Sequence, residues 1–273
     1  MSISKAFLKH VFCVSILLLS GVLLTPLNAQ AEPSPIFNGK DLTGWKQVTG
    51  SAPYTVEREQ IVGTAVLNSP NSFLCTEREY ANFILEFEFW VDAPLNSGVM
   101  FRCHSRTIKD DKQQIYGYQM EIDPSPRAYT GGIYDEARRS WIYPLHYNLP
   151  AREAFRQGAW NKARIVATGN HLRTYINGHS AANLVDDFDD SGMICLQVHA
   201  ISPGDLEGKS VRWKNITIQE NPDAKESSVK TTDGPLENLI PNTLTATEKP
   251  PMAGVGPNWT ISPPKAGPLK TVN

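Results

Sequence analysis

The chain has 273 residues, of which 41% are hydrophobic and 20% are charged, a composition that excludes a disordered polymer and a membrane-embedded protein. Lysine and arginine number 26 against 28 aspartates and glutamates, so the net charge of −2 lacks the basic excess of proteins that bind nucleic acid. Twenty prolines and nineteen glycines predict many turns between short elements, which favours a β-rich fold over a helical bundle.

The first 31 residues have the pattern of a signal peptide. Lys5 and Lys9 precede a largely apolar run over residues 11–24, and Ala29-Gln30-Ala31 supplies the small residues that a signal peptidase reads. The run of fourteen residues is shorter than the roughly 20 that span a bilayer as a helix, which makes an uncleaved anchor the weaker alternative. We expect cleavage after Ala31, export to the periplasm or the extracellular space, and no stable membrane insertion of the mature chain.

Period-2 alternation of apolar and polar residues dominates the chain after this segment. In residues 83–91 every odd-numbered position is apolar, while Glu86 and Glu88 point the other way. Asn177-Gly178 has the sequence of a type I′ hairpin turn, and only residues 150–155 indicate a helical turn. The predicted strands cover residues 60–67, 83–91, 97–103, 116–122, 162–168, 172–176, 192–198 and 211–219. They predict an all-β fold of two packed antiparallel sheets, a jelly-roll sandwich of the concanavalin A and laminin-G kind.

Three cysteines follow the predicted cleavage point: Cys75, Cys103 and Cys195. Their odd number excludes complete internal pairing, and no two are spaced as in a C-x-x-C motif. One disulfide plus a free thiol is possible. Alternatively, Cys103 and Cys195 are buried thiols within apolar strands, where they act as small hydrophobic residues rather than as nucleophiles.

Three predicted strands each carry polar residues on one face. In residues 97–104 the apolar Val99, Phe101 and Cys103 share a face, and the same alternation occurs in residues 116–123 and 192–199. If the strands are neighbours, the opposite faces form one concave polar surface that binds a ligand; the alternative is an ordinary solvated face. The residues of this surface are Arg102, His104, Gln119, Glu121, Asp123, Gln197 and His199.

Glu121 and Asp123 lie on one face with backbones roughly 6.6 to 7 Å apart, close to the carboxyl separation used in glycoside cleavage. The Glu-Ile-Asp triplet is similar to that of retaining β-glucanases with the same sandwich fold. Their motif continues to another glutamate, whereas here residues 124–126, Pro-Ser-Pro, end the strand. Asp123 could instead cap the turn before Pro124.

The loop of residues 129–141 combines aromatic and charged side chains. Such a mixture suits a sugar, which offers an apolar C–H face and a rim of hydroxyl groups. The alternative is that the aromatic residues belong to the core and the arginines to a solvated turn. The candidate ligands in this loop are Tyr134, Asp135, Arg139 and Trp141.

From residue 221 the composition changes, because residues 221–273 hold nine of the twenty prolines and show no periodicity. We expect one folded domain over residues 32–220 and a proline-rich, disordered tail over residues 221–273.

Several segments together resemble the bacterial 3-keto-disaccharide hydrolase family, formerly a domain of unknown function with a concanavalin-like sandwich. The resemblance covers residues 36–220, and its most specific segment is FNGKDLTGW at residues 37–45. The other segments, in the same order as in the family, are NSGVMFR (96–102), GYQMEID (117–123), TGGIYD (130–135), WN (160–161), YING (175–178) and LQVH (196–199).

This resemblance implies an enzyme that acts on glycosides whose sugar a partner oxidoreductase has oxidised to a ketone at C3. The ketone acidifies the C2 proton, so that a base forms an enolate, the C1 substituent leaves by elimination, and water can complete net hydrolysis. We assign Glu121 or His199 as the base, and Arg102 and His104 as enolate or hydroxyl ligands. Asp123 and Gln119 are assigned as positioning or metal-binding groups.

A divalent cation could replace the arginine as electrophile, although spacing alone establishes no cofactor. Many family members have the acid at the position of Gln119 and an amide at that of Glu121, the reverse of this chain. Two other functions remain open: a lectin-like carbohydrate-binding module without catalysis, and a retaining glycosidase that acts on unoxidised glucans.

Overall fold

The computed structural model describes residues 32–202, 204, 206–223 and 244–245. The predicted signal peptide and most of the predicted tail lie outside these residues. The strands run as β1 (Ser34–Pro35), β2 (Trp45–Thr49), β3 (Tyr54–Glu57), β4 (Gln60–Thr64), β5 (Ser72–Thr76), β6 (Phe83–Val91), β7 (Ser97–Thr107) and β8 (Gln113–Ile122). They continue as β9 (Ile133–Glu136), β10 (Ser140–Tyr143), β11 (Asn161–Thr168), β12 (His171–Ile176), β13 (His179–Val185), β14 (Met193–Val198), β15 (Ser210–Glu220) and β16 (Leu244–Thr245).

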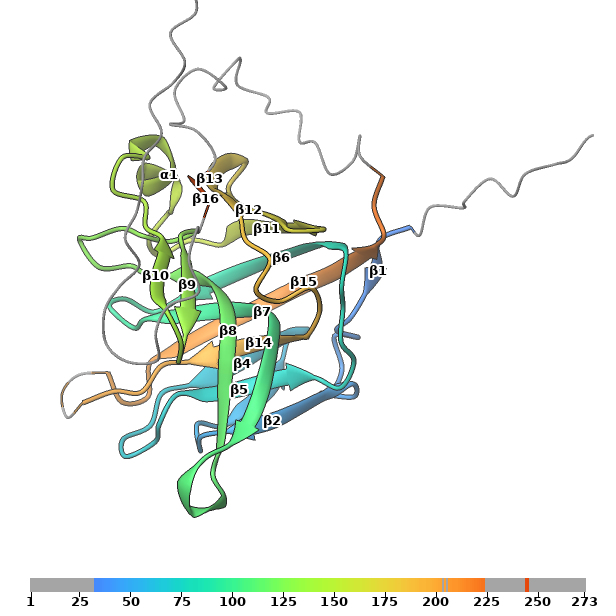
Figure 1. The fold of residues 1–273 in the computed structure, drawn as a ribbon. Coiled ribbons are helices and arrows are strands. Elements are labelled where there is room, and N and C mark those ends of the chain that lie inside the picture. The colour runs from blue at the N-terminus through green and yellow to red at the C-terminus, as the bar shows by residue number, and fades with distance from the viewer. Residues whose placement is uncertain (1–31, 203, 205, 224–243, 246–273) are drawn as a thin grey trace, which may run out of the picture.

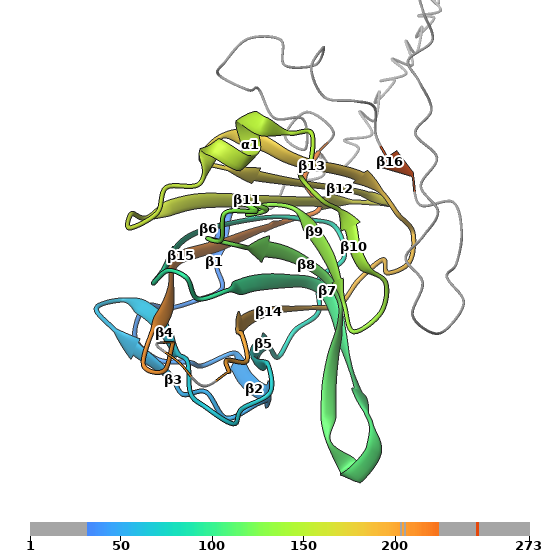
Figure 2. The same cartoon turned by 90° about the vertical axis from the view of Figure 1, so that its left-hand side faces the viewer.

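These strands form two sheets that face each other (Figures 1 and 2). In the described residues, sheet A has nine strands in the order β16-β13-β12-β11-β6-β15-β4-β3, with β1 paired to β15. Sheet B has seven strands in the order β10-β9-β8-β7-β14-β5-β2. The pairs are antiparallel except for β13 with β16. The predicted all-β, two-sheet antiparallel sandwich is therefore confirmed.

The predicted alternation places apolar side chains between the sheets. Phe83, Leu85 and Phe89 of β6 are fully buried, as is Trp213 of the neighbouring β15. The eight predicted strands are all present, but the sequence alternation did not indicate shorter strands such as β2, β5 and β9 at and beside the edges of sheet B. The predicted helical turn is α1 (Leu149–Ala154), capped by the Asn148 side chain. No helix in the described residues is long and apolar enough to cross a membrane.

β7 and β8 are longer than predicted because they continue into a hairpin that projects from the sandwich (Figure 2). Ile108 and a short 3₁₀ turn, η1 (Lys109–Asp111), connect the two strands at its tip. Residues 104–107 and 113–114 are polar and at least partly exposed, so this part of the hairpin shows no apolar alternation in the sequence.

A β-bulge in β7 contradicts the predicted facing of Arg102, Cys103 and His104. Pairing with β8 passes from Phe101 to His104, so residues 102 and 103 together oppose a single residue, Gly117. Arg102 has a φ of 47°, and Cβ atoms on Gly117 and Gly192 would lie 2.9 and 2.5 Å from the bulge backbone. Because a bulge inserts one residue, the alternation changes phase there. Cys103 therefore shares a cluster with Met100 on the outer face of sheet B, not with Val99 and Phe101 in the core.

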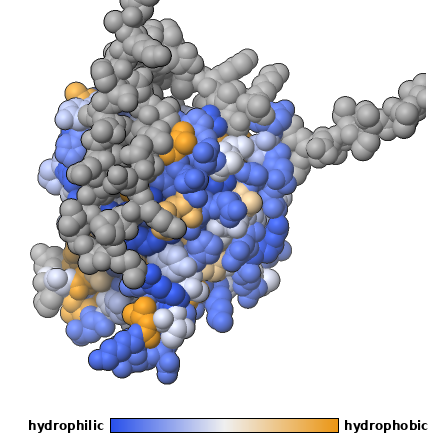
Figure 3. Space-filling model, in the orientation of Figure 1, coloured by the Kyte–Doolittle hydropathy of each residue, from blue (hydrophilic) through white to orange (hydrophobic). Residues whose placement is uncertain are grey.

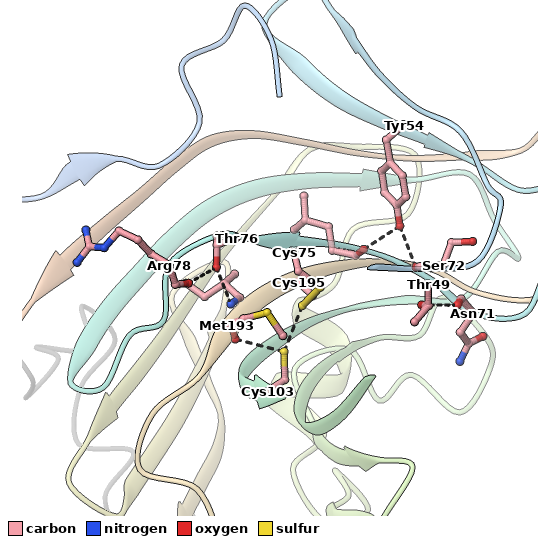
Figure 4. The surroundings of a disulfide bond; sticks show 12 residues. Thr49, Tyr54, Asn71, Ser72, Cys75, Thr76, Arg78, Cys103, Met193 and Cys195 are labelled. Atoms are coloured by element: carbon pink, nitrogen blue, oxygen red, sulfur yellow. Dashed lines mark hydrogen bonds between the residues drawn. A yellow bond between two sulfur atoms is a disulfide. The ribbon is translucent and has the colours of Figure 1, made fainter. Parts of the chain in front are cut away.

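The bulge also brings Cys103 beside a disulfide (Figure 4). Cys75 of β5 and Cys195 of β14 are direct cross-strand partners and form the disulfide, and the free Cys103 is buried with its Sγ 3.2 Å from Sγ of Cys195. Of the two arrangements left open by the sequence, one disulfide plus one free thiol is the observed one. The sulfur atoms lie in the outer cluster of sheet B, which comprises Phe73, Cys75, Met100, Cys103, Ile115 and Cys195.

Candidate functional site

Sheet B brings polar residues from distant parts of the chain into neighbouring rows. Glu121 of β8 pairs with Gly98 of β7, which in turn pairs with Gln197 of β14. Two residues along β8, Gln119 pairs with Tyr134 of β9. Alternation along the strands turns these side chains to the outer face of sheet B, away from sheet A. The polar stripes predicted for residues 116–123 and 192–199 thus lie together, separated only by β7.

The polar side chains on these neighbouring strands line a pocket of about 290 Å³, here called the polar pocket. Gly98 lies in β7 between its pairing partners Glu121 and Gln197, and a Cβ atom there would lie 2.4 Å from Cδ of Gln119. The missing side chain therefore leaves the space that the Gln119 amide occupies. The lining residues are Asn71, Asn96, Gln119, Glu121, Arg127, Tyr134, Glu136, Trp141, Gln197 and His199.

Glu121 is a buried carboxyl whose pKa differs strongly from its ordinary value. Its Oε1 accepts a hydrogen bond from Asn96 Nδ2 (2.8 Å), and its Oε2 accepts one from Gln119 Nε2 (2.9 Å). Burial outweighs these hydrogen bonds and raises the pKa from 4.5 to about 7. A carboxyl with this pKa can accept and return a proton near neutral pH, as a general base requires.

Two glutamine side chains in the polar pocket have polar atoms that find no hydrogen-bond partner among the described residues. These atoms are both amide atoms of Gln197 and Oε1 of Gln119, and the two residues are 0% and 2% exposed. Buried amide groups almost always have partners, because leaving one unpaired costs about 1–3 kcal/mol. A ligand with hydroxyl or carbonyl groups would supply the missing hydrogen bonds.

His199 lies at the end of β14 with its ring held in one tautomer. Its Nδ1 is 2.6 Å from the carbonyl oxygen of Ala200, which only accepts hydrogen bonds, so Nδ1 carries the proton. In the neutral ring Nε2 keeps a free electron pair. The neighbouring Asn71 accepts a hydrogen bond from Ala200 N (2.9 Å) and donates one to Glu136 Oε1 (3.2 Å).

The contact between Asn71 and Glu136 shows how strongly sheet B curls. Asn71 precedes β5 and Glu136 ends β9, and three strands lie between β5 and β9 in the sheet. The two parts of the sheet can touch only if its outer face is concave. This curvature places Asn71, Glu136 and His199 around one pocket.

Aromatic rings and a cation border the polar pocket on the β9–β10 side. Tyr134 and Trp141 pack edge to face with ring centroids 5.3 Å apart. The Arg127 guanidinium lies 4.9 Å from the Trp141 ring centroid and within 4.0 Å of Glu121 Oε1. Of the predicted ligands in residues 129–141, Tyr134 and Trp141 therefore line the pocket.

The structure places Asp123 outside the lining of the polar pocket, in the role of a turn cap. Its carboxylate accepts hydrogen bonds from the backbone N of Ser125 (3.2 Å) and Tyr129 (3.3 Å), and from Arg127 Nε (2.7 Å). Burial favours a higher pKa, but these hydrogen bonds and the positive charge of Arg127 outweigh it and lower the pKa of Asp123. Asp123 thus orders the loop that carries Arg127, as the turn-capping alternative predicts.

Two further predicted ligands, Asp135 and Arg139, lie on the inner face of sheet B. Because Tyr134 points outward from β9, the next residue points inward, and Asp135 is fully buried. It forms ion pairs with Arg138 and Arg139, and Arg139 also pairs with Asp186. These charges neutralise one another inside the sandwich, and the structure places Asp135 and Arg139 outside the lining of the polar pocket.

The bulge likewise removes Arg102 and His104 from the polar pocket, contrary to the prediction. Arg102 is fully buried and donates hydrogen bonds to the carbonyl oxygens of Ala81 (2.8 Å) and Gly169 (2.7 Å). His104 lies on the projecting hairpin with Nε2 3.5 Å from Asp189 Oδ1. Arg102 therefore joins two loops, and Arg127 is the arginine that lies at the pocket.

Replacement of Arg102 by Met is expected to lower the free energy of unfolding by about 2–4 kcal/mol, because the carbonyl groups of Ala81, Gly169 and Asp189 lose the charged donor that holds them together. Chemical denaturation measures this change. As a control, Arg78→Met removes an ion pair with Glu220 whose arginine side chain is 65% exposed, and should change stability by less than about 1 kcal/mol. Unchanged stability together with lost ligand binding would instead place Arg102 at the site.

Four lining residues were not among the predicted ligands: Asn71, Asn96, Arg127 and Glu136. Asn96 and Glu136 could have been found, since they share strand parity with Gly98 and Tyr134. Asn71 precedes a strand that was not predicted. Arg127 belongs to a loop, whose course no periodicity indicates.

The polar pocket does not fit a metal ion. In the ranges that the structure describes, no group of three or more His, Cys, Asp or Glu side chains is arranged to hold one. Both oxygens of Glu121 instead face amide N–H donors, which are hydrogen-bond partners and not metal ligands. The divalent cation considered as an alternative to the arginine has no matching set of residues among those described.

Comparison with known proteins relates the chain to carbohydrate-active proteins. The model of a family described as "3-keto-alpha-glucoside-1,2-lyase-like domain" matches residues 32–219. None of the curated proteins matches the chain in sequence.

Solved structures share the sandwich fold. A protein of unknown function with a galectin-like fold from Bacillus subtilis is 10% identical, with a TM-score of 0.50 over 70% of this chain and 96% of that chain. A candidate glycosyl hydrolase from Parabacteroides distasonis is 18% identical (TM-score 0.49, 70% of this chain and 94% of that chain). The carbohydrate binding module CBM66 from Bacillus subtilis is 16% identical (TM-score 0.42, 65% of this chain and 96% of that chain).

Proposed function

Because the chain belongs to the 3-keto-alpha-glucoside-1,2-lyase-like domain family, we propose that it is an exported enzyme that cleaves glycosides carrying a ketone at C3. Family membership itself establishes a carbohydrate-related function. The observation that carries the finer proposal is the buried Glu121, with a pKa of about 7, in a pocket beside unpaired amide groups. This pairs a base for a weakly acidic C–H group with hydrogen-bond donors for a developing oxyanion.

The reaction begins at C2 of the sugar. Glu121 takes the C2 proton, and the electrons of the C–H bond form the C2–C3 double bond of an enolate. The enolate oxygen accepts a hydrogen bond from Gln197 Nε2. The positive charge of Arg127, which lies beside Glu121, stabilises the negative charge of the enolate. Arg127 thus takes the electrostatic role that the sequence suggested for Arg102.

Collapse of the enolate restores the C3 ketone, forms a C1–C2 double bond and expels the C1 oxygen with its bonding electrons. His199, protonated at Nε2, gives its proton to this leaving oxygen, while its Nδ1–H stays bonded to Ala200. Addition of water across the C1–C2 double bond would complete net hydrolysis. Trp141 and Tyr134 offer aromatic surfaces for the sugar ring.

The Cys75–Cys195 disulfide supports export, since disulfides persist in oxidising compartments outside the cytoplasm.

The proposed substrate also requires a preceding reaction. A sugar oxidoreductase must convert the C3 hydroxyl to a ketone before the C2 proton becomes acidic enough for a carboxylate to remove.

The test compares matched oxidised and unoxidised α-glucosides. We expect the protein to release the leaving group from methyl 3-keto-α-glucoside and from 3-keto-trehalose, and to leave methyl α-glucoside and trehalose intact, because only the ketone acidifies C2. Product formation is followed by NMR. Binding of the ketones without turnover would favour a carbohydrate-binding module, and cleavage of the unoxidised sugars would favour a glycosidase.

A further inference from the structure

A second pocket of about 430 Å³ lies between the β7–β8 hairpin and the β2–β5 side of sheet B. Asn71 and Glu136 line both this hairpin pocket and the polar pocket, so the two meet at the hydrogen-bonded Asn71–Glu136 pair. The lining residues of the hairpin pocket are Val48, Thr49, Gly50, Pro70, Asn71, Phe73, Ile108, Lys112, Gln113, Gln114, Ile115 and Glu136.

The hairpin pocket differs in chemistry from the polar pocket. Phe73 and Ile115 belong to the outer cluster of sheet B, Val48 packs against that cluster, and Ile108 comes from the hairpin tip. Ile108 is 41% exposed, whereas the residues on either side of it are charged or polar. Figure 3 accordingly shows a small hydrophobic area over the hairpin amid hydrophilic surface. An exposed apolar side chain at the mouth of a pocket favours a ligand with an apolar part.

We propose that the hairpin pocket holds the leaving group of the substrate, and that this leaving group is an apolar aglycone. The inference rests on the proposed function, which puts the sugar in the polar pocket beside Glu121. A glycoside that reaches past the Asn71–Glu136 pair places its polar sugar among amides and a carboxyl and its aglycone against Val48, Phe73 and Ile108. The volume of about 430 Å³ lies in the range of small-molecule sites, about 300–1,000 Å³.

The variant Ile108→Ser tests this assignment without disturbing the core, because Ile108 is exposed. For 4-nitrophenyl 3-keto-α-glucoside, kcat/KM should fall about tenfold, since apolar contact with the aglycone is lost. For methyl 3-keto-α-glucoside, whose leaving group does not reach the hairpin, it should stay within about twofold. The matched control is Leu149→Ser, an apolar residue of α1 that is 57% exposed and lines neither pocket. It should change neither substrate.

A binding measurement separates failure of this inference from failure of the proposed function. Dissociation constants of unoxidised 4-nitrophenyl α-glucoside and methyl α-glucoside are measured by NMR titration, with no turnover required. The wild type should bind the aryl glucoside more tightly, and Ile108→Ser should remove that preference. Equal affinities in the wild type, or a preference that survives in Ile108→Ser, would overturn the aglycone assignment even if 3-keto glycosides are cleaved. If no 3-keto glycoside is cleaved, the proposed function fails, and the same affinities still decide whether the hairpin pocket binds the aglycone.

Discussion

Replacement of Glu121 by Gln is expected to lower kcat/KM on 3-keto-α-glucosides by about 10²- to 10⁴-fold, the usual contribution of a general base. Gln keeps the shape of the side chain and can keep both hydrogen bonds, because its carbonyl accepts from Asn96 and the Gln119 amide can turn to present Oε1. The variant should therefore still bind the unoxidised glucoside. Steady-state kinetics and an NMR titration measure the two effects.

The pH dependence of the wild type supports the same assignment. Since burial raises the pKa of Glu121 to about 7, kcat/KM should rise as pH increases through about 7, where the carboxylate forms. Glu136→Gln is the comparison, because Glu136 is a second pocket carboxyl whose pKa burial raises. Glu136 ends β9 and accepts a hydrogen bond from Asn71. Its replacement should reduce kcat/KM less than Glu121→Gln does, and kcat/KM of Glu136→Gln should still rise with pH near 7. A larger loss in Glu136→Gln would transfer the role of base to Glu136.

As pH rises towards about 7, the stability of the wild type should fall while its activity rises. The folded pKa of Glu121, about 7, exceeds its ordinary value of 4.5, so the folded chain binds this proton more tightly than the unfolded chain. The wild type thus loses up to about 3 kcal/mol as pH rises from about 4.5 to 7, and the loss persists above that range. Glu121→Gln cannot ionise, so its stability relative to the wild type should be greater at pH 8 than at pH 5. Denaturation at both pH values measures this difference.

Replacement of Gly98 by Ala is expected to lower kcat/KM by about 10²-fold while the fold survives. The added Cβ would lie 2.4 Å from Cδ and 2.8 Å from Oε1 of Gln119, so the amide must move off Glu121. A misplacement of about 1 Å near reacting groups can cost about 10²-fold in rate. The clash involves the far part of a flexible side chain, so folding should be little affected. Kinetics and denaturation of the same preparation measure both quantities.

The double variant Gly98→Ala with Gln119→Ala separates this clash from other effects. If the loss in Gly98→Ala acts through Gln119, adding it to Gln119→Ala should cost almost nothing further, because the clashing atoms are already gone. Fully additive losses would show that Gly98 matters for another reason, such as direct approach of the sugar to β7. Full activity of Gly98→Ala would show that the Gln119 amide need not stay bonded to Glu121 for the reaction.

Much of the site was predictable because side-chain alternation along a strand is a local property. Residues 116–122 place Gln119 and Glu121 on one face whatever else the chain does, and residues 192–198 do the same for Gln197. The alternation in residues 83–91 likewise determined a buried strand and, with the other strands, the two-sheet fold. The aromatic Tyr134 and Trp141 were found through composition, because they are two of the three large rings in residues 129–141.

What only the tertiary structure decided depends on contacts between segments distant in sequence. The bulge at Arg102 is accommodated by Gly117 of β8 and by Gly192, which directly precedes β14, so its change of phase cannot be seen in the pattern of β7 alone. The curl of sheet B, not any motif, brings Asn71 to Glu136. The raised pKa of Glu121 arises from burial, and burial is a property of the folded chain that alternation can suggest but cannot measure.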